Sequence, residues 1–326
     1  MSFIVDCQSH IFPREYAELL TRNRNSLRIS GGDGVYQIDY GGVQRFRLNL
    51  DDYSPRSKLA DMDRSGVDMS VISVNIPAPD MLEPQLALKG ARICNDAIAA
   101  LCAKHPDRFV GIASLPLNDL PAAIAELERA VSELDLRGVF LPSHVDGVHL
   151  DDPRFEPFYA RVAALGVPLV LHPTVPVWAD AIREHSMIPM AGFMIDTSFA
   201  MLRLILGGAM ERHPQLKVVH PHCGGALPYL MGRVVEQTEV KRRGRDHISQ
   251  SPRETYRRVY LDLVSPSQLA VNFALDFAGA GNLLFGSDHP WVTIDAIMQY
   301  VSELDCSPAE MALILGGNAR ELFGID

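Results

Sequence analysis

The sequence predicts an α/β fold, a (β/α)8 barrel, on the basis of three observations. From residue 67 onward, short β-rich apolar runs alternate with amphipathic stretches of about 10 to 20 residues, which is typical of parallel strands joined by helical crossovers. Together with the first run, the strand candidates number eight: residues 3–7, 67–73, 109–115, 137–142, 168–173, 216–222, 258–263 and 282–288. A doubly wound open sheet is the alternative, but no GxGxxG motif follows the first strand to support it.

The segments between the strands carry the capping residues that begin helices. Asp119 followed by Pro121 begins one helix, and residues 151–153 begin another. Ser307 with Glu310 forms a capping box, which predicts the start of the last helix. These signals place helices between the strand candidates, as a barrel requires.

Two stretches break the alternation of strands and helices. Residues 22–56 contain two glycine-rich turns and predict a small β-hairpin insertion between the first strand and its helix. Residues 174–197 follow the fifth strand and are long enough to form a loop or a short helix over the barrel mouth. We expect residues 1–326 to form a single barrel domain that carries this insertion.

Composition excludes several classes of protein. Hydrophobic content of 47% and charged content of 21% are ordinary for a soluble globular protein, and there is no run of 18 apolar residues to span a membrane. A net charge of −10, with one dense basic run at 241–245, disfavours binding to nucleic acid. Five scattered cysteines without CxxC spacing disfavour a disulfide framework. The first residues lack the pattern of a signal peptide, so we expect a cytoplasmic protein.

Polar side chains gather at the predicted carboxyl ends of the strands, where barrel active sites lie. These residues are Gln8, His10, His172, His220, His222, Asp288 and His289. A lone histidine at a strand end is more often a hydrogen-bonded packing residue than a ligand, but several from different strands favour a shared site. Imidazoles with a carboxylate suit Zn²⁺ or a similar divalent ion that keeps one position open for water or substrate.

Other residues are weaker candidates for contacts with a substrate. Arg45 and Arg47 in the insertion could hold a carboxylate, although exposed hairpin arginines commonly have no specific partner. Trp178 and Phe193 could line a substrate pocket, although aromatic side chains are as often packed in a core. We expect the histidines in helical or loop contexts to lie at the surface: His105, His185, His213 and His247.

The chain resembles the amidohydrolase-2 branch of the amidohydrolase superfamily, which includes 2-amino-3-carboxymuconate-6-semialdehyde decarboxylase and metal-dependent aromatic-acid decarboxylases. The matching motifs run almost from end to end and include DCQSHIFP, LADMDRSGVDMSVIS, HPQLKVVHPHCGGALPYLMGR, LLFGSDHPW and NARELFGI. The resemblance implies a distorted (β/α)8 barrel with one divalent metal, usually zinc and sometimes manganese, and no organic cofactor. It also implies a homodimer, because relatives often form dimers.

The resemblance assigns roles to individual residues. His10, His172 and Asp288 match the family's metal ligands, and His222 matches its catalytic histidine. Gln8 departs from the pattern, because the family has His or, in some decarboxylases, Glu there. A neutral amide oxygen is a poorer ligand for zinc than imidazole or carboxylate, so Gln8 could weaken the metal, change its identity or leave it untouched.

The expected activity is nonoxidative decarboxylation of a small unsaturated or aromatic carboxylic acid. His222 and Asp288 would transfer the proton, since imidazole titrates near neutral pH. A metal-dependent hydrolase of a lactone, an amide or an activated C–C bond would use the same residues. A metal-free binding protein that kept the barrel is the third hypothesis. Metal analysis and substrate profiling separate the three.

Overall fold

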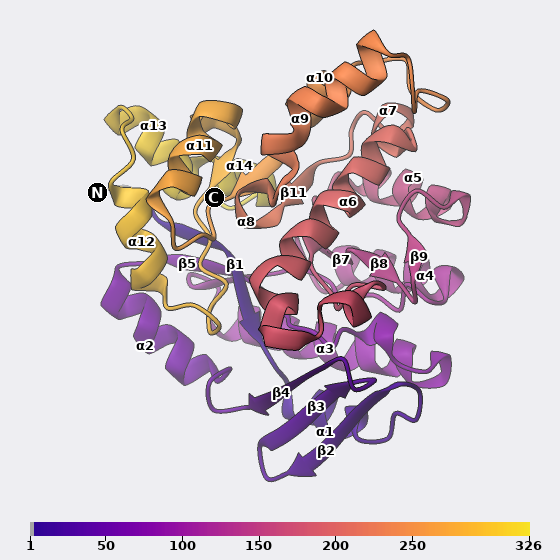
Figure 1. Ribbon diagram of the computed structural model, residues 1–326. Coiled ribbons are helices and arrows are strands. Elements are labelled where there is room, and N and C mark those ends of the chain that lie inside the picture. The colour runs from indigo at the N-terminus through magenta and orange to yellow at the C-terminus, as the bar shows by residue number, and fades with distance from the viewer. Residues whose placement is uncertain (1–2) are drawn as a thin grey trace.

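The computed structural model describes residues 3–326 and contains all eight predicted strands in the predicted order. They form a (β/α)8 barrel with helices around it (Figure 1). The strand bounds are β1 Val5–Ile11, β5 Met69–Val74, β6 Phe109–Gly111, β7 Val139–Pro142, β10 Leu169–His172, β11 Val218–His220, β12 Tyr260–Asp262 and β13 Leu283–Leu284. Every residue of β1 and β5 is buried, as in strands covered on both faces.

The barrel is closed, but its ladder is regular in only two parts. One part has the strand order β1-β5-β6 and the other has the order β13-β12-β11-β10-β7, and all of these pairs are parallel. Single bridges join the parts, from Ala113 to Val139 and from Ser9 to His289. The second bridge forms a seam between β1 and the segment after the short strand β13.

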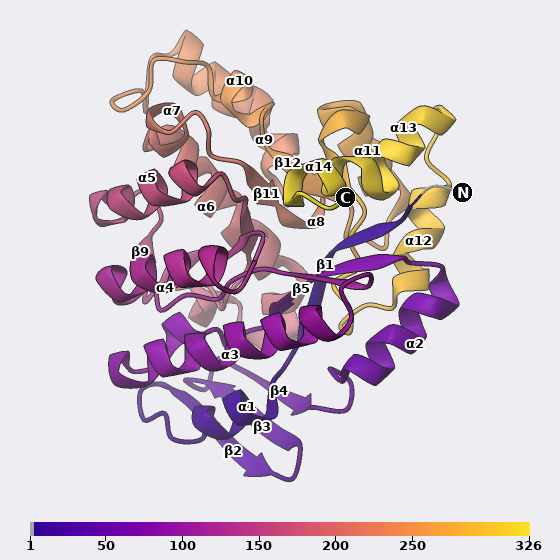
Figure 2. The ribbon, with the colours of Figure 1, turned by 180° about the vertical axis from the view of Figure 1, so that it is seen from behind.

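Helices surround the strands, and Figure 2 shows α3, α4 and α5 side by side on one flank. The predicted caps are present: Asp119 accepts a hydrogen bond from the backbone N–H of Ala122, and Ser307 and Glu310 form a capping box. The helix bounds are α1 Arg14–Leu20, α2 Pro55–Ser65, α3 Pro84–Lys104, α4 Leu120–Ser132, α5 Glu156–Leu165, α6 Phe193–Leu206, α7 Ala209–Arg212, α8 Pro221–Gly224, α9 Leu227–Val235, α10 Pro252–Tyr256, α11 Gln268–Ala278, α12 Ile294–Ser302, α13 Pro308–Ala312 and α14 Asn318–Phe323.

The insertion is a three-stranded antiparallel sheet rather than the single hairpin that the sequence predicts, and it follows α1 instead of preceding the first helix. Its strands are β2 Leu27–Gly32, β3 Val35–Tyr40 and β4 Gln44–Asn49. Alternating burial along β2 makes it a strand despite its glycine-rich end. Asp33 and Gly34 both have positive φ, as a tight two-residue hairpin turn requires. The sheet lies at one end of the molecule, near the carboxyl end of β1 (Figure 1).

The stretch after β10 is helical and covers part of the barrel mouth, as the sequence predicts. Short 3₁₀ turns η3 Ala179–Ile182 and η4 Glu184–Ser186 lead into a π-helical turn, η5 Ile188–Gly192, which continues as α6. By length and composition alone the 23 residues Glu184–Leu206 could cross a membrane, but half of their most apolar window is buried within the fold. Packing within the fold therefore accounts for much of their apolar character.

Candidate metal centre

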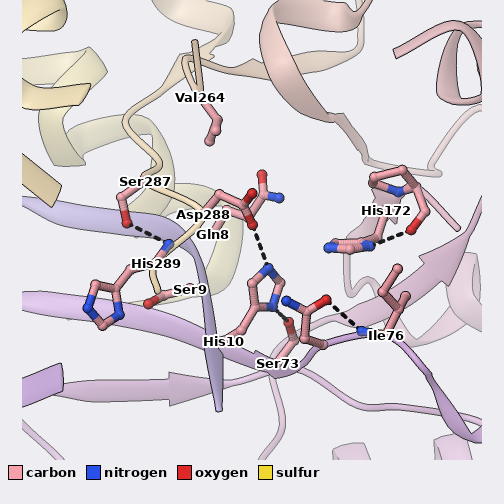
Figure 3. Close-up of polar contacts among 12 residues, drawn as sticks. Gln8, Ser9, His10, Ser73, Ile76, His172, Val264, Ser287, Asp288 and His289 are labelled. Carbon is pink, nitrogen blue, oxygen red and sulfur yellow. Dashed lines mark hydrogen bonds and ion pairs between the residues drawn. The ribbon is translucent and has the colours of Figure 1, made fainter. Parts of the chain in front are cut away.

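Three of the predicted metal ligands meet at the carboxyl ends of the barrel strands (Figure 3). His10 lies on β1, His172 ends β10, and Asp288 follows β13. One potential ligand atom from each residue lies within 4.8 Å of the others. His10 Nε2 is 2.9 Å from Asp288 Oδ1, and the two imidazole rings are 5.0 Å apart. Residues separated by more than 270 positions thus form one potential coordination site.

Hydrogen bonds orient both imidazoles toward this site. His172 Nδ1–H donates to the carbonyl oxygen of Pro173 at 2.8 Å, so Nε2 keeps its lone pair. Burial, with a smaller effect of His10, lowers the pKa of His172 to about 3, so the ring is neutral at physiological pH. Nδ1 of His10 lies 2.9 Å from Ser73 Oγ. Partners of this kind on the far ring nitrogen are typical of metal-ligating histidines.

Asp288 is held in an uncommon backbone conformation. Its φ is +62°, in the left-handed region, and its N–H donates to the carbonyl oxygen of Gln8 at 2.8 Å. Burial would raise the pKa of the carboxyl, but the imidazoles of His10 and His222 outweigh burial and hold this pKa well below its usual range. The side chain is therefore an anion that faces two histidines.

Gln8 contributes a side chain whose polar atoms lack partners. It lies two residues before His10 on β1 and therefore on the same face of the strand. It is 4% exposed, and within residues 3–326 neither Oε1 nor Nε2 has a hydrogen-bond partner. Figure 3 shows its amide beside Asp288. A buried unpaired amide is costly, so a divalent ion held by Oε1 together with the two imidazoles and the carboxylate fits these residues.

His222 lies beside this group and lines the same cavity. Its backbone is left-handed, with φ +57° and ψ +54°, and its N–H donates to Asp262 Oδ1 at 2.7 Å. Its Nε2 lies 4.0 Å from Asp288 Oδ2. Burial alone would lower the pKa of the imidazole, but the carboxylates of Asp288 and Asp262 raise it above its usual value. His222 is thus able to carry a proton next to the potential metal ligands.

The cavity above these residues has a volume of about 720 Å³ and largely apolar walls. Phe46 comes from β4 of the insertion, Phe193 from α6 and Phe273 from α11. Trp291 packs edge-on against Phe46, with ring centroids 5.5 Å apart. Asn75, His172, His222 and Asp288 lie among the polar residues of the lining. The cavity suits a flat, apolar molecule with one polar end.

The structure does not bring every predicted contact residue to this cavity. Arg45 lines it, although its guanidinium is largely exposed and pairs with Asp39 at 2.7 Å. Arg47 is exposed on β4 and is not part of the lining. Trp178 lines a separate cavity on the other side of α6, next to Asp196. Arg47 and Trp178 are therefore removed from the set of candidate contacts.

Two further strand-end histidines have hydrogen-bond partners outside the ligand group. Nδ1 of His220 pairs with the hydroxyl of Tyr256 at 2.8 Å, and neither His220 nor His289 lines the cavity. The ring of His289 lies between Lys58 and Asp61, behind the barrel wall. Among the wall residues, the sequence predictions included Phe193 but missed Phe46, Phe273 and Trp291. Trp291 was accessible to sequence reasoning, because it stands three positions after Asp288.

Comparison with known proteins agrees with this geometry. The family model described as amidohydrolase matches residues 5–325. γ-Resorcylate decarboxylase from Rhizobium sp. (strain MTP-10005) is 32% identical over 315 residues, which cover 90% of this chain and 93% of that protein. The crystal structure of 5-carboxyvanillate decarboxylase from Sphingomonas paucimobilis superposes with a TM-score of 0.89 at 26% identity, over 100% of both chains. A dihydroxybenzoic acid decarboxylase from Polaromonas sp. JS666, solved with manganese and the inhibitor 2-nitroresorcinol, has a TM-score of 0.83 at 25% identity and covers 100% of this chain and 98% of its own. The chain belongs to the amidohydrolase family.

Proposed function

We propose that this protein is a metal-dependent nonoxidative decarboxylase of a small aromatic carboxylic acid. The observation that carries the proposal is the meeting of His10, His172 and Asp288, of which His172 and Asp288 line a cavity with aromatic walls. The γ-resorcylate and 5-carboxyvanillate decarboxylases match nearly the whole length of this chain, which supports the same reaction class. We place a flat aromatic ring in the cavity that Phe46 and Phe193 line, with its carboxylate toward His172 and Asp288.

The metal would be held by Nε2 of His10, Nε2 of His172, the carboxylate of Asp288 and Oε1 of Gln8. When bound, a divalent ion would supply positive charge to the substrate carboxylate and to a neighbouring hydroxyl oxygen. We favour Mn²⁺ over the Zn²⁺ expected from the sequence, because two of these four ligands are oxygens and one of those is a neutral amide. Manganese in the Polaromonas neighbour supports this preference.

His222 would give a proton to the ring carbon that loses CO₂. The C–C bond breaks with its electron pair left on that carbon, and the proton on His222 Nε2 forms the new C–H bond, so the acid becomes the arene and CO₂. Asp288 and Asp262 raise the pKa of His222, which keeps this proton on the imidazole near neutral pH. The apolar walls exclude water and so favour loss of the charged carboxylate as neutral CO₂.

The direct test is product analysis of purified protein with a panel of hydroxybenzoic acids. We expect Mn²⁺-loaded protein to release CO₂ and form the corresponding phenol, and we expect chelation to stop the reaction until Mn²⁺ returns. Ring opening or hydrolysis without CO₂ would favour the hydrolase instead. If neither manganese nor zinc binds near one equivalent, the metalloenzyme proposal fails.

Substitution of Gln8 tests whether its amide is a ligand. Gln8→Glu adds one negative charge at ligand distance and should tighten Mn²⁺ binding by roughly tenfold or more. Gln8→Leu keeps a side chain of similar size but removes the oxygen that would bind the ion, so it should weaken Mn²⁺ binding. Titration of metal-free protein with Mn²⁺ measures both. Equal affinities for the wild type and the Leu variant would show that position 8 does not touch the ion.

The two tryptophans of the chain form a matched pair for testing the cavity assignment. Trp291→Ala removes an aromatic wall and should raise KM for an aromatic acid about tenfold or more. Trp178→Ala removes the same side chain from the separate cavity and should leave KM unchanged. Steady-state kinetics with one substrate compares them. A larger effect at Trp178 would place the substrate on the other side of α6.

A further inference from the structure

Lys58 of α2 is a fully buried lysine that does not line the substrate cavity. Its Nζ lies 2.6 Å from Ser9 Oγ and 2.8 Å from Nδ1 of His289, and it also reaches the carbonyl oxygen of His289 at 3.5 Å. All of these contacts lie at the seam where β1 meets the segment after β13. Burial of a lysine side chain costs free energy unless its amino group is hydrogen-bonded, so a lysine at this position indicates that its contacts have a role.

The contacts of Asp61 and Lys58 fix the tautomer of the His289 ring. The carboxylate of Asp61 can only accept, so Nε2–H of His289 donates to Asp61 Oδ2 at 2.8 Å and Nδ1 accepts from Lys58 Nζ. Asp61 is partly exposed and is held by Arg64 from the same helix. A line of hydrogen bonds therefore runs from the buried seam through His289 to the surface of α2.

These hydrogen bonds hold His289, the residue that directly follows Asp288. On the other side of Asp288, Ser287 donates from its N–H and its hydroxyl to the carboxylate of Asp6, at 2.9 and 2.6 Å. Regular pairing of β13 stops at Leu284. Beyond it, backbone hydrogen bonds join Cys7 N–H to Phe285, Asp288 N–H to Gln8 and His10 N–H to His289, and these side chains add to them. Figure 3 shows Asp288 pointing toward His10 while the ring of His289 points away from the metal centre.

The backbone of Asp288 needs this support. A positive φ at a residue other than glycine costs free energy and persists only where its surroundings enforce it. Asp6 anchors the residue before it, and Lys58 with Asp61 anchors the residue after it. Released from one anchor, the segment could relax and turn the carboxylate away from His10 and His172.

We propose that Lys58 is a positioning residue, which acts through His289 to aim the carboxylate of Asp288 into the metal centre. This inference rests on the proposed function, in which Asp288 is a metal ligand. It explains why a helix on the outside of the barrel places a lysine at the seam. It also places a determinant of metal affinity on an element that supplies no ligand.

The test is a Mn²⁺ titration of metal-free variants, with unbound Mn²⁺ followed by its electron paramagnetic resonance signal. Lys58→Met keeps the apolar stem and should weaken Mn²⁺ binding about tenfold or more, as loss of partners around metal ligands does elsewhere. Lys58→Arg restores a donor and should recover part of the affinity. Met62→Ala is the matched control, because Met62 is equally buried in α2 and should lose stability but not Mn²⁺ affinity.

Asp61→Asn provides a second route if Lys58→Met fails to fold. It weakens the outer end of the same line at a partly exposed position and should reduce Mn²⁺ affinity by a smaller factor. A folded Lys58→Met protein with wild-type affinity overturns the inference, as does an equal loss in Met62→Ala. A wild-type protein that binds no Mn²⁺ overturns the proposed function, and the inference falls with it.

Discussion

Replacement of His222 by asparagine should lower the rate of CO₂ release by a factor of ~10² to 10⁴, the usual contribution of a positioned acid or base. Asparagine tolerates the left-handed backbone at this position better than most residues, so the hydrogen bond from the backbone N–H to the carboxylate of Asp262 should survive. The variant keeps His10, His172 and Asp288 and should bind Mn²⁺ normally. Single-turnover measurements at saturating substrate, with metal content determined on the same sample, separate the two effects.

The control for this variant is His105→Asn, which changes a histidine outside the cavity lining and should leave turnover unchanged. Restored turnover of His222→Asn with added imidazole would further identify the missing group as an acid or base. Full activity of His222→Asn without imidazole would show that another group supplies the proton.

Replacement of His172 by alanine should remove Mn²⁺ binding and, with it, all measurable decarboxylation. The imidazole is neutral, its Nε2 has a free lone pair, and its orientation is fixed by the carbonyl oxygen of Pro173. Calorimetric titration with Mn²⁺ measures the loss directly, and thermal unfolding of the metal-free protein shows whether the fold survives.

His185→Ala serves as the comparison for this experiment, because His185 is exposed in the segment after β10 and lies outside the ligand group. Its Mn²⁺ affinity should match that of the wild type. One equivalent of tightly bound Mn²⁺ in His172→Ala would remove this histidine from the proposed coordination sphere.

The strands were predictable because buried parallel strands have continuous apolar sequences, but the positions at which the strands end were not predictable. The first strand was predicted to end at residue 7, whereas β1 continues to Ile11. Gln8, Ser9 and His10 are polar and yet buried, since two of them serve the site and Ser9 serves the seam. Polar residues that belong to a site interrupt the apolar pattern by which a strand is predicted, so the strand is predicted too short. The glycines at the end of β2 concealed that strand, so the insertion was predicted with two strands instead of three.

The candidate metal centre was predictable to the extent that its residues stand at strand ends, where the barrel geometry brings them together. The walls of the cavity were harder to predict, because Phe46 and Trp291 meet from opposite ends of the chain and no local pattern couples them. Trp178 was misplaced for the opposite reason. It follows His172 closely in sequence, but α6 separates its cavity from the candidate metal ligands.

Phe46 and Trp291, which pack edge-on, come from different parts of the fold. The ligand group and His222 belong to the barrel, whereas Phe46 belongs to a sheet that is formed by residues 27–49 and inserted between α1 and α2. One wall of the cavity therefore comes from outside the barrel, whereas Phe193, Phe273 and Trp291 come from segments that connect the barrel strands. Replacement of this sheet would change the wall that Phe46 forms and leave the ligand group in the barrel. The replacement would have to keep the packing of buried side chains such as Ile38 and Leu48, because they share one hydrophobic core with the barrel.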